Sequence, residues 1–183
     1  YMDTHHPYEP PEEYLSAKSL TASRSRSELG ELSRELVKSD HIETISHDDL
    51  ADVRVAYQAS CQYIGDEIAK FADRLQSEGY FDPERDIFVL TADHGECLRP
   101  ETGILGHAPA AFYEDILNVP LMIAAPEWDT QQIDGQVSLI DLMPTVLQLA
   151  DLPVPNSVEG TAASTPSNLQ RDIAMAVTKS PAE

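Results

Sequence analysis

Apolar residues recur at steps of three or four between about Asp48 and Glu78, and this spacing predicts one long amphipathic helix. Ser46 precedes this segment as a candidate N-cap. Gly79 follows it, and glycine commonly ends a helix because it adopts the left-handed backbone conformation at little cost. The predicted apolar face consists of Leu50, Val53, Tyr57, Cys61, Ile64, Ile68, Phe71 and Leu75.

Shorter patterns predict further helices and strands. Leucines at helical spacing favour a helix over residues 27–38, and a second apolar stripe favours a helix over residues 138–150. Apolar runs predict buried strands at 87–91 and 118–125, and a last strand at 173–177. Because helices alternate with buried strands, the expected fold class is α/β, a mostly parallel sheet flanked by helices.

The excess of acidic residues excludes two classes of binding partner. Acidic residues outnumber basic ones 32 to 12, which gives a formal net charge of −20. Such a surface repels nucleic-acid backbones and anionic membranes, so we expect neither as a partner. An anionic substrate would need local cations to offset this field. One explanation for the acidity is a halophilic origin, since high salt screens dense like charge. The alternative is an ordinary acidic protein of a mesophile, and the salt dependence of the unfolding temperature distinguishes the two.

The two cysteines, Cys61 and Cys97, each lack a close-spaced partner and form neither a zinc-ligand pair nor a disulfide framework. We expect Cys61 in the core and a non-catalytic role for Cys97. This cysteine usage fits a reducing compartment, so a cytoplasmic location is expected. No apolar run is long enough to span a bilayer. Because the chain begins at Tyr1 without a leader, we interpret its N-terminus as cut.

Candidate metal ligands follow the first predicted strand. The segment 87–96 reads IFVLTADHGE, so Asp93 and His94 come directly after the strand. Sites in α/β proteins lie beyond the carboxyl ends of strands, where these side chains can offer oxygen and nitrogen to a divalent cation. Gly95 permits a sharp turn that points both side chains at one place. The alternative is a structural turn capped by Asp93, with His94 exposed.

Two further histidines lie in loops that suit a site. His107 follows a glycine in the segment Leu105-Gly106-His107, and His5 stands beside prolines that stiffen its loop. Histidine can bind a metal, donate to an anion or move a proton near neutral pH. The neighbouring His6 is a weaker candidate for the same role.

The chain resembles the sulfatase family of the alkaline-phosphatase superfamily. The resemblance rests on TADHGE, on GILGHAPAAFYEDILNVPLMIAAP and on VSLIDLMPTVLQLADLPVP, in that order. Upstream, YMDTHHPYEPP resembles the family's His-x-Pro-Tyr loop, and AYQASCQYIGDEIAKFADRL resembles the helix before its last metal-ligand strand. The resemblance implies that residues 1–183 are the C-terminal portion of a single catalytic domain, a partial three-layer sandwich.

The resemblance also implies roles for matched residues. Asp93 and His94 would bind one divalent cation, which could be Ca, Mn, Mg or Zn. His5 would contact the anionic ester group, and His107 would lie near the leaving group. Asp141 and Pro144 match a family signature at the start of a helix, where we expect them to cap the helix and to fix the path of the chain.

One departure limits these expectations. The family's nucleophile, a cysteine in a Cys-x-Pro-x-Arg type motif that becomes formylglycine, has no counterpart in this sequence. The expected function is therefore a sulfuric ester hydrolase, inactive as this chain alone, acting on a small-molecule or saccharide sulfate ester. The alternatives are a phosphoric-ester or phosphonate hydrolase, a phosphoethanolamine-type transferase, or a non-catalytic binding domain. Apolar faces that lack their neighbours would also favour self-association.

Overall fold

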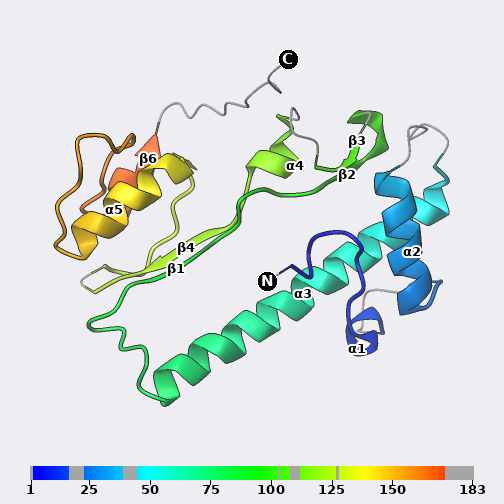
Figure 1. The fold of residues 1–183 in the computed structure, drawn as a ribbon, viewed down its shortest axis with the longest axis horizontal. Helices are drawn as coiled ribbons and strands as arrows, with labels where there is room; N and C mark the ends of the chain where they lie inside the picture. Colours follow the sequence, from blue (N-terminus) through cyan, green and yellow to red (C-terminus); the bar gives the residue numbers. More distant parts are fainter. Residues whose placement is uncertain are drawn as a thin grey trace. The chain divides into compact units, whose positions relative to one another are not determined.

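The computed structural model describes residues 2–16, 23–38, 45–102, 104–107, 112–126 and 128–171 (Figure 1). The chain forms two compact units. Unit 1 consists of Tyr1–Glu78 and His94–Val119, and unit 2 consists of Gly79–Asp93 and Pro120–Glu183. The chain therefore passes between the units directly after Asp93. Within the described residues, no helix is long and apolar enough to cross a membrane.

Unit 1 is built on the long helix α3, His47–Ser77. Its start is fixed as the sequence predicts, because the Ser46 hydroxyl accepts a hydrogen bond from the Asp49 main-chain nitrogen at 3.0 Å. Its end is also as predicted, since Gly79 follows the C-cap with a φ of +76°. The helix α2, Arg26–Val37, confirms the second predicted helix, and the short α1, Glu12–Leu15, was not predicted.

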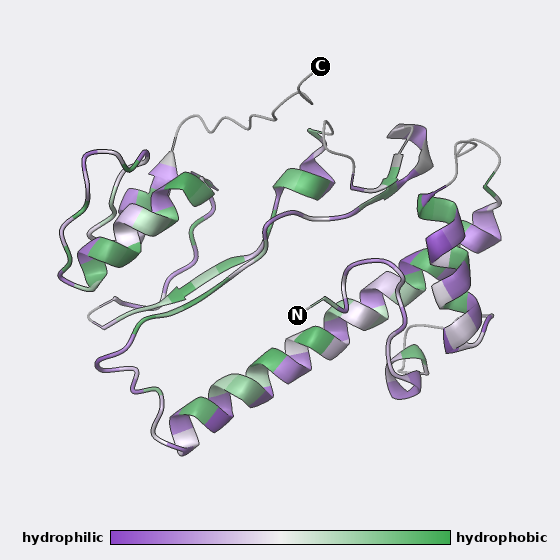
Figure 2. Ribbon diagram, viewed as in Figure 1, coloured by the Kyte–Doolittle hydropathy of each residue, from purple (hydrophilic) through white to green (hydrophobic). Residues whose placement is uncertain are grey.

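The buried apolar residues of α3 extend only as far as Ile64. Figure 2 shows hydrophobic and hydrophilic residues alternating along the helix. Farther along, Phe71 is 47% exposed. The prediction that Cys61 is a core residue is wrong, because this residue is exposed although its helix is buried on both sides of it in the sequence. The buried cluster of unit 1 contains Tyr8, Leu15, Leu29, Leu50, Val53, Ala56, Ala59, Leu98 and Leu105.

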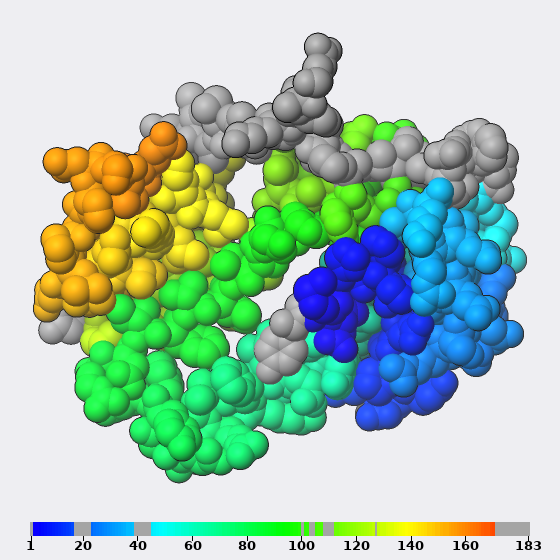
Figure 3. Space-filling model, in the orientation of Figure 1, coloured from blue at the N-terminus to red at the C-terminus, as the bar shows by residue number. Residues whose placement is uncertain are grey.

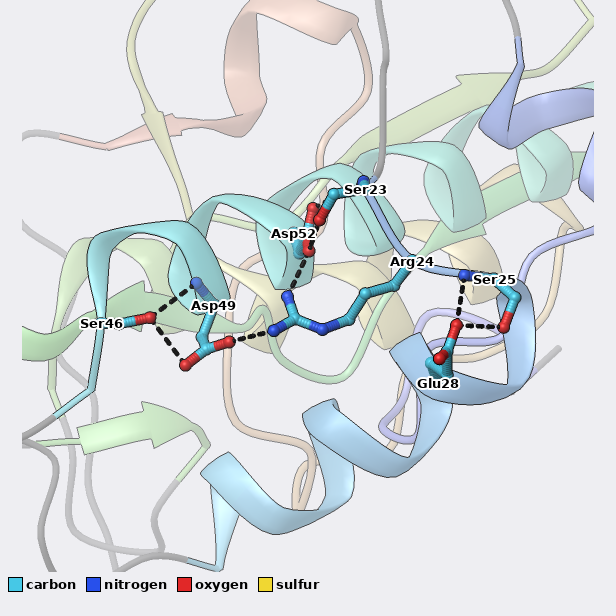
Figure 4. Close-up of polar contacts among 7 residues, drawn as sticks. All are labelled: Ser23, Arg24, Ser25, Glu28, Ser46, Asp49 and Asp52. Atoms are coloured by element: carbon cyan, nitrogen blue, oxygen red, sulfur yellow. Dashed lines mark hydrogen bonds and ion pairs between the residues drawn. The ribbon is translucent and has the colours of Figure 1, made fainter.

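An ion-pair network joins the start of α2 to the start of α3 (Figure 4). The Arg24 guanidinium donates to Asp49 at 2.5 Å and also to Asp52, whose side chain is buried. Burial opposes ionisation of Asp52, but hydrogen bonds from Ser23 and Arg24 outweigh it and lower the pKa of this carboxyl. The two helix starts are thereby held together by a paired rather than an isolated buried charge.

A hairpin completes unit 1. Strand β2, Cys97–Arg99, pairs antiparallel with β3, Ile104–Gly106, through the 3₁₀ turn η2, Pro100–Thr102. The Arg54 side chain of α3 donates two hydrogen bonds, at 3.0 and 2.7 Å, to the Leu98 carbonyl oxygen and so fixes β2 to the helix. The short helix α4, Glu114–Leu117, follows. These elements are too short to show a periodic pattern in the sequence.

Unit 2 contains the predicted strands 87–91 and 118–125 in shortened form. They are β1, Phe88–Thr91, and β4, Leu121–Ala124, which pair antiparallel with Thr91 opposite Leu121. The predicted helix over residues 138–150 is present as the 3₁₀ turn η3, Leu139–Asp141, followed by α5, Leu142–Leu149. The predicted strand 173–177 lies outside the described residues.

The rest of unit 2 is a loop folded over α5. The 3₁₀ turn η4 covers Pro166–Leu169, and a two-residue bridge joins β5, Gln136–Val137, to β6, Gln170–Arg171. The expectation that Asp141 caps the helix is wrong, because its side chain makes no capping hydrogen bond. Its buried carboxylate instead accepts from the Thr161 main-chain nitrogen at 2.6 Å, and this bond holds the loop.

The expected mostly parallel sheet is not present among the described residues. All three strand pairs there are antiparallel: β1 with β4, β2 with β3, and β5 with β6. The β2–β3 pair could not be otherwise, because a short turn can join only antiparallel neighbours, whereas parallel strands need a long crossover. Apolar runs identify strands but do not specify the direction in which their partners run.

Two glycines provide a matched test of this packing. A methyl group at Gly95 would overlap the Asp115 carbonyl oxygen, whereas Gly65, within α3, has nothing within 4 Å of the same position. We expect Gly95→Ala to lower the free energy of unfolding by about 1–3 kcal/mol through overpacking. Gly65→Ala should raise it by about 0.5–1 kcal/mol, because alanine favours helix. Urea unfolding followed by circular dichroism measures both, and equal effects would contradict the close approach at Gly95.

Candidate functional site

Four histidines from three segments of unit 1 lie together. The His5 and His6 rings stack with centroids 4.3 Å apart, and the His107 ring lies 5.1 Å from that of His5. The His94 ring lies 4.0 Å from that of His107. All four side chains are partly buried. The fold therefore brings His5, His94 and His107, which the sequence analysis selected, into one cluster.

A buried carboxylate, Glu96, holds this cluster in place. One of its oxygens accepts a hydrogen bond from Nδ1 of His107, and the other accepts from the Tyr8 hydroxyl. The Glu96 side chain is only 4% exposed, so these bonds replace the water that an ionised carboxylate needs. Because Nδ1 of His107 carries the donated proton, Nε2 is the ring nitrogen left for chemistry.

Tyr8 connects this carboxylate to the helical core. Its main-chain nitrogen donates to the Ser33 hydroxyl at 3.0 Å, and Ser33 donates to the Gly30 carbonyl oxygen on α2. Its ring packs edge-on against Tyr57 of α3, with centroids 5.3 Å apart. The space-filling view shows the N-terminal segment packed against α2 (Figure 3). Tyr8 therefore fixes the loop that carries His5, through its hydroxyl to Glu96 and through its main chain and ring to α2 and α3.

The other histidines are oriented by main-chain carbonyls. Nδ1 of His5 bonds to the His6 carbonyl oxygen at 2.7 Å, and Nδ1 of His94 bonds to the Gly95 carbonyl oxygen at 3.0 Å. A carbonyl can only accept, so each Nδ1 carries the proton. Nδ1 of His6 differs, because it is buried without a hydrogen-bond partner among the described residues. Burial, and then the neighbouring His5, lower the pKa of His6.

Glycines shape the loops for a different reason from the one expected. Gly95 is not among the described residues with a positive φ, so it supplies no left-handed turn. It is needed because the backbone approaches closely there, and its nitrogen donates to the Ile116 carbonyl oxygen at 2.8 Å. Gly106, with a φ of +82°, provides the left-handed conformation immediately before His107.

The remaining sequence candidates lie as follows. Asp93 is exposed and ends the unit 2 segment that contains β1. Cys97 is buried, and its sulfur lies 3.3 Å from the Thr102 hydroxyl rather than in the histidine cluster. Tyr8 and Glu96 were not among the candidates predicted from the sequence. Glu96 stands in the quoted TADHGE segment, so its place in the motif was the available signal.

A divalent cation fits the chemistry of Asp93 and His94. His94 has its Nδ1 proton directed to a carbonyl, so Nε2 keeps a lone pair for a metal. Asp93, the preceding residue in the sequence, offers a carboxylate from unit 2. By residue type alone, an oxygen and nitrogen set of this kind suits several divalent ions. A polar hollow elsewhere, lined in part by Gln131, Asp134 and Gln170 of unit 2, contains none of the predicted site residues.

The buried Tyr8 hydroxyl gives the cluster a pH signature. Burial, and then the Glu96 carboxylate, raise the pKa of Tyr8 above its ordinary value. The folded state thus favours the protonated hydroxyl, and the stability from this preference is complete below about pH 10 and lost as pH rises further. We expect the unfolding temperature to fall above about pH 10.

Variants separate Tyr8 from the other tyrosines. Tyr8→Phe should lower the free energy of unfolding by about 1–3 kcal/mol at pH 7, because Glu96 loses a donor, and should weaken the alkaline decline. Tyr80→Phe is the control, since Tyr80 is 74% exposed. Thermal unfolding between pH 7 and 11 measures both effects. An identical alkaline decline in the two variants would contradict the assignment.

Comparison with known proteins identifies relatives. The chain is 31% identical over 169 residues to the uncharacterized sulfatase YidJ of Escherichia coli, a match that covers 87% of this chain and 32% of the relative. It is 30% identical over 113 residues to arylsulfatase K of Xenopus laevis, with 61% of this chain and 20% of the relative covered. The chain thus spans about a third or less of these relatives. Neither match bears on a halophilic origin.

A solved structure and a family model extend the comparison. The phosphonate monoester hydrolase of Silicibacter pomeroyi matches with a TM-score of 0.56 and 24% identity, over 73% of this chain and 27% of that one. This likeness shows a shared alkaline-phosphatase-like fold and nothing about activity. The model of the family described as Sulfatase matches residues 1–152. The chain therefore belongs to the sulfatase family, whose members are typically metal-dependent hydrolases.

Proposed function

We propose that this chain is the C-terminal part of a metal-dependent sulfuric ester hydrolase whose nucleophile lies in a longer parent chain. The observation that carries the proposal is the meeting of His5, His94 and His107 around buried Glu96. Family membership and coverage of about a third of one relative support it. The proposed substrate is a small-molecule or saccharide sulfate ester.

His107 is the proposed proton donor. In its protonated form, Nε2–H can give a proton to the leaving oxygen of the ester, while Nδ1–H stays bonded to Glu96. The buried Glu96 carboxylate stabilises the positive imidazolium and keeps its Nδ1 side directed at Glu96. His5 is the proposed contact for the anionic ester group, because its Nδ1 proton is held by a carbonyl and its ring lies beside that of His107, with centroids 5.1 Å apart.

Asp93 and His94 are the proposed ligands of the family's cation. When bound, such a cation acts as a Lewis acid on the ester and on the nucleophile. His94 would bind through Nε2, since its Nδ1 proton is directed to the Gly95 carbonyl oxygen. The cation would also offset part of the net charge of −20, which otherwise repels an anionic ester.

Exposed apolar side chains support the proposed longer parent. Phe71, Phe112, Leu117 and Met122 are each 47% exposed or more. In a larger domain, such residues would be covered by neighbouring strands and helices. We propose that the isolated 183-residue chain self-associates for the same reason, and that the parent acts in the cytoplasm, in keeping with two unpaired cysteines.

The rival functions share these residues and differ in the nucleophile and the pocket. Phosphoric-ester or phosphonate hydrolysis is the nearest, and the shared fold with a phosphonate monoester hydrolase keeps it open. A phosphoethanolamine-type transferase needs the same type of metal and histidine contacts. A non-catalytic binding domain agrees with the lack of a nucleophile motif in this sequence.

A matched pair of esters tests the proposal. We expect the parent protein to hydrolyse an aryl sulfate faster than the corresponding aryl phosphate in the presence of divalent cations. Asp93→Ala should lower sulfate turnover at least about a hundredfold, because the cation stabilises the transition state by several kcal/mol. Asp129→Ala is the control, since Asp129 is an exposed loop residue. The 183-residue chain alone should show little or no turnover.

Each other outcome selects a different function. Turnover of the phosphate alone would move the protein to phosphoryl chemistry. Absence of metal-dependent turnover on both esters would favour the binding domain. Rapid hydrolysis by the 183-residue chain alone would refute the proposal that the nucleophile lies outside it.

A further inference from the structure

His6 is the member of the histidine cluster that has no role in the proposed reaction. Its Nδ1 is buried and has no hydrogen-bond partner among the described residues. Buried polar atoms nearly always have a partner, because leaving one without costs about 1–3 kcal/mol. An unpartnered imidazole nitrogen inside a cluster of imidazoles is what a missing ligand would leave behind.

The neighbouring rings offer nitrogen atoms to the same place. One ligand atom each from His5, His6 and His107 can lie within 4.8 Å of one another. The Nδ1 protons of His5 and His107 are directed to a carbonyl oxygen and to the Glu96 carboxylate, so their Nε2 atoms keep lone pairs. Histidines that bind metals usually donate their other ring proton to such partners.

We propose that His5, His6 and His107 form a second cation site, which binds a transition-metal ion such as Zn²⁺ and is distinct from the cation at Asp93 and His94. Three imidazoles suit Zn²⁺, Co²⁺, Ni²⁺ or Cu²⁺, whereas Ca²⁺ and Mg²⁺ require oxygen ligands. Zn–N bonds of about 2.1 Å place ligand nitrogens at most about 4 Å apart, so small ring rotations close the site.

If the proposed ester hydrolysis is correct, an ion bound at this site also inhibits that reaction. The ion occupies the Nε2 lone pairs of His5 and His107, which the ester contact and the proton transfer require. Binding of Zn²⁺ therefore inhibits the enzyme, and a chelator restores it. Metal binding itself does not depend on turnover, so it can be tested even if the chain hydrolyses no ester.

Calorimetric titration with Zn²⁺ tests the site directly. The 183-residue chain is titrated in excess Mg²⁺, which fills carboxylate sites on the acidic surface and leaves imidazoles free. We expect one Zn²⁺ per chain, and His6→Ala should weaken its affinity at least about tenfold. His47→Ala is the matched control, because His47 is exposed at the start of α3, and should leave the affinity unchanged.

Two outcomes would overturn the proposal. The first is the absence of saturable Zn²⁺ binding over Mg²⁺, or an affinity that His6→Ala leaves unchanged. The second is binding that survives His6→Ala but is lost in Glu96→Gln, since His94, Glu96 and His107 form the other candidate group of ligands. Circular dichroism confirms that each variant is folded, and His6→Gln repeats the test with a larger neutral side chain.

Inhibition of the parent protein provides the second measurement. In excess Mg²⁺, Zn²⁺ should inhibit ester turnover, and His6→Ala should raise the inhibitory concentration by the same factor as the calorimetric affinity. Equal inhibition of the parent and of His6→Ala would refute the regulatory role. If no ester is turned over, the proposed function fails while the titration still decides the metal site.

Discussion

The Glu96 carboxylate is the constraint on which the rest of unit 1 depends. A charge buried this deeply is tolerated only when it is paired, and Tyr8 and His107 are the two donors that pair with it. Tyr8 belongs to the N-terminal loop, and His107 follows the β2–β3 hairpin. One buried acid therefore fixes the relative position of two loops that are distant in sequence, and each loop carries a candidate site histidine.

Local patterns in the sequence predicted the helices well. The bounds of α2 were predictable from the helical spacing of its leucines alone. Those of α3 were predictable because helical periodicity, an N-cap serine and a terminal glycine all mark the same segment. Apolar residues of α3 are buried as far as Ile64. Beyond Ile64 the predicted face is not buried, because amphipathicity predicts which face can pack against a partner but not whether a partner is present in the chain.

Properties that depend on distant residues were not predictable in the same way. Strand direction is one, since an apolar run at β1 or β4 pairs with whichever strand the topology brings beside it. Glu96 is another, because an acidic residue after a histidine is unremarkable until Tyr8 and His107 are placed against it. The role of Gly95 was also misjudged, since close approach of the Asp115 carbonyl is a tertiary contact.

The histidine cluster has to satisfy opposing requirements. An anionic ester approaching a chain of net charge −20 requires local positive or donor groups, and imidazoles provide them without a permanent charge. To act, His5 and His107 must present Nε2 inward, so their Nδ1 protons are held by a carbonyl and by Glu96. That orientation is also the one that prepares an imidazole to bind a metal. A site built to contact an anion through oriented histidines is consequently open to capture by a transition-metal ion, and the additional nitrogen of His6 strengthens that competition.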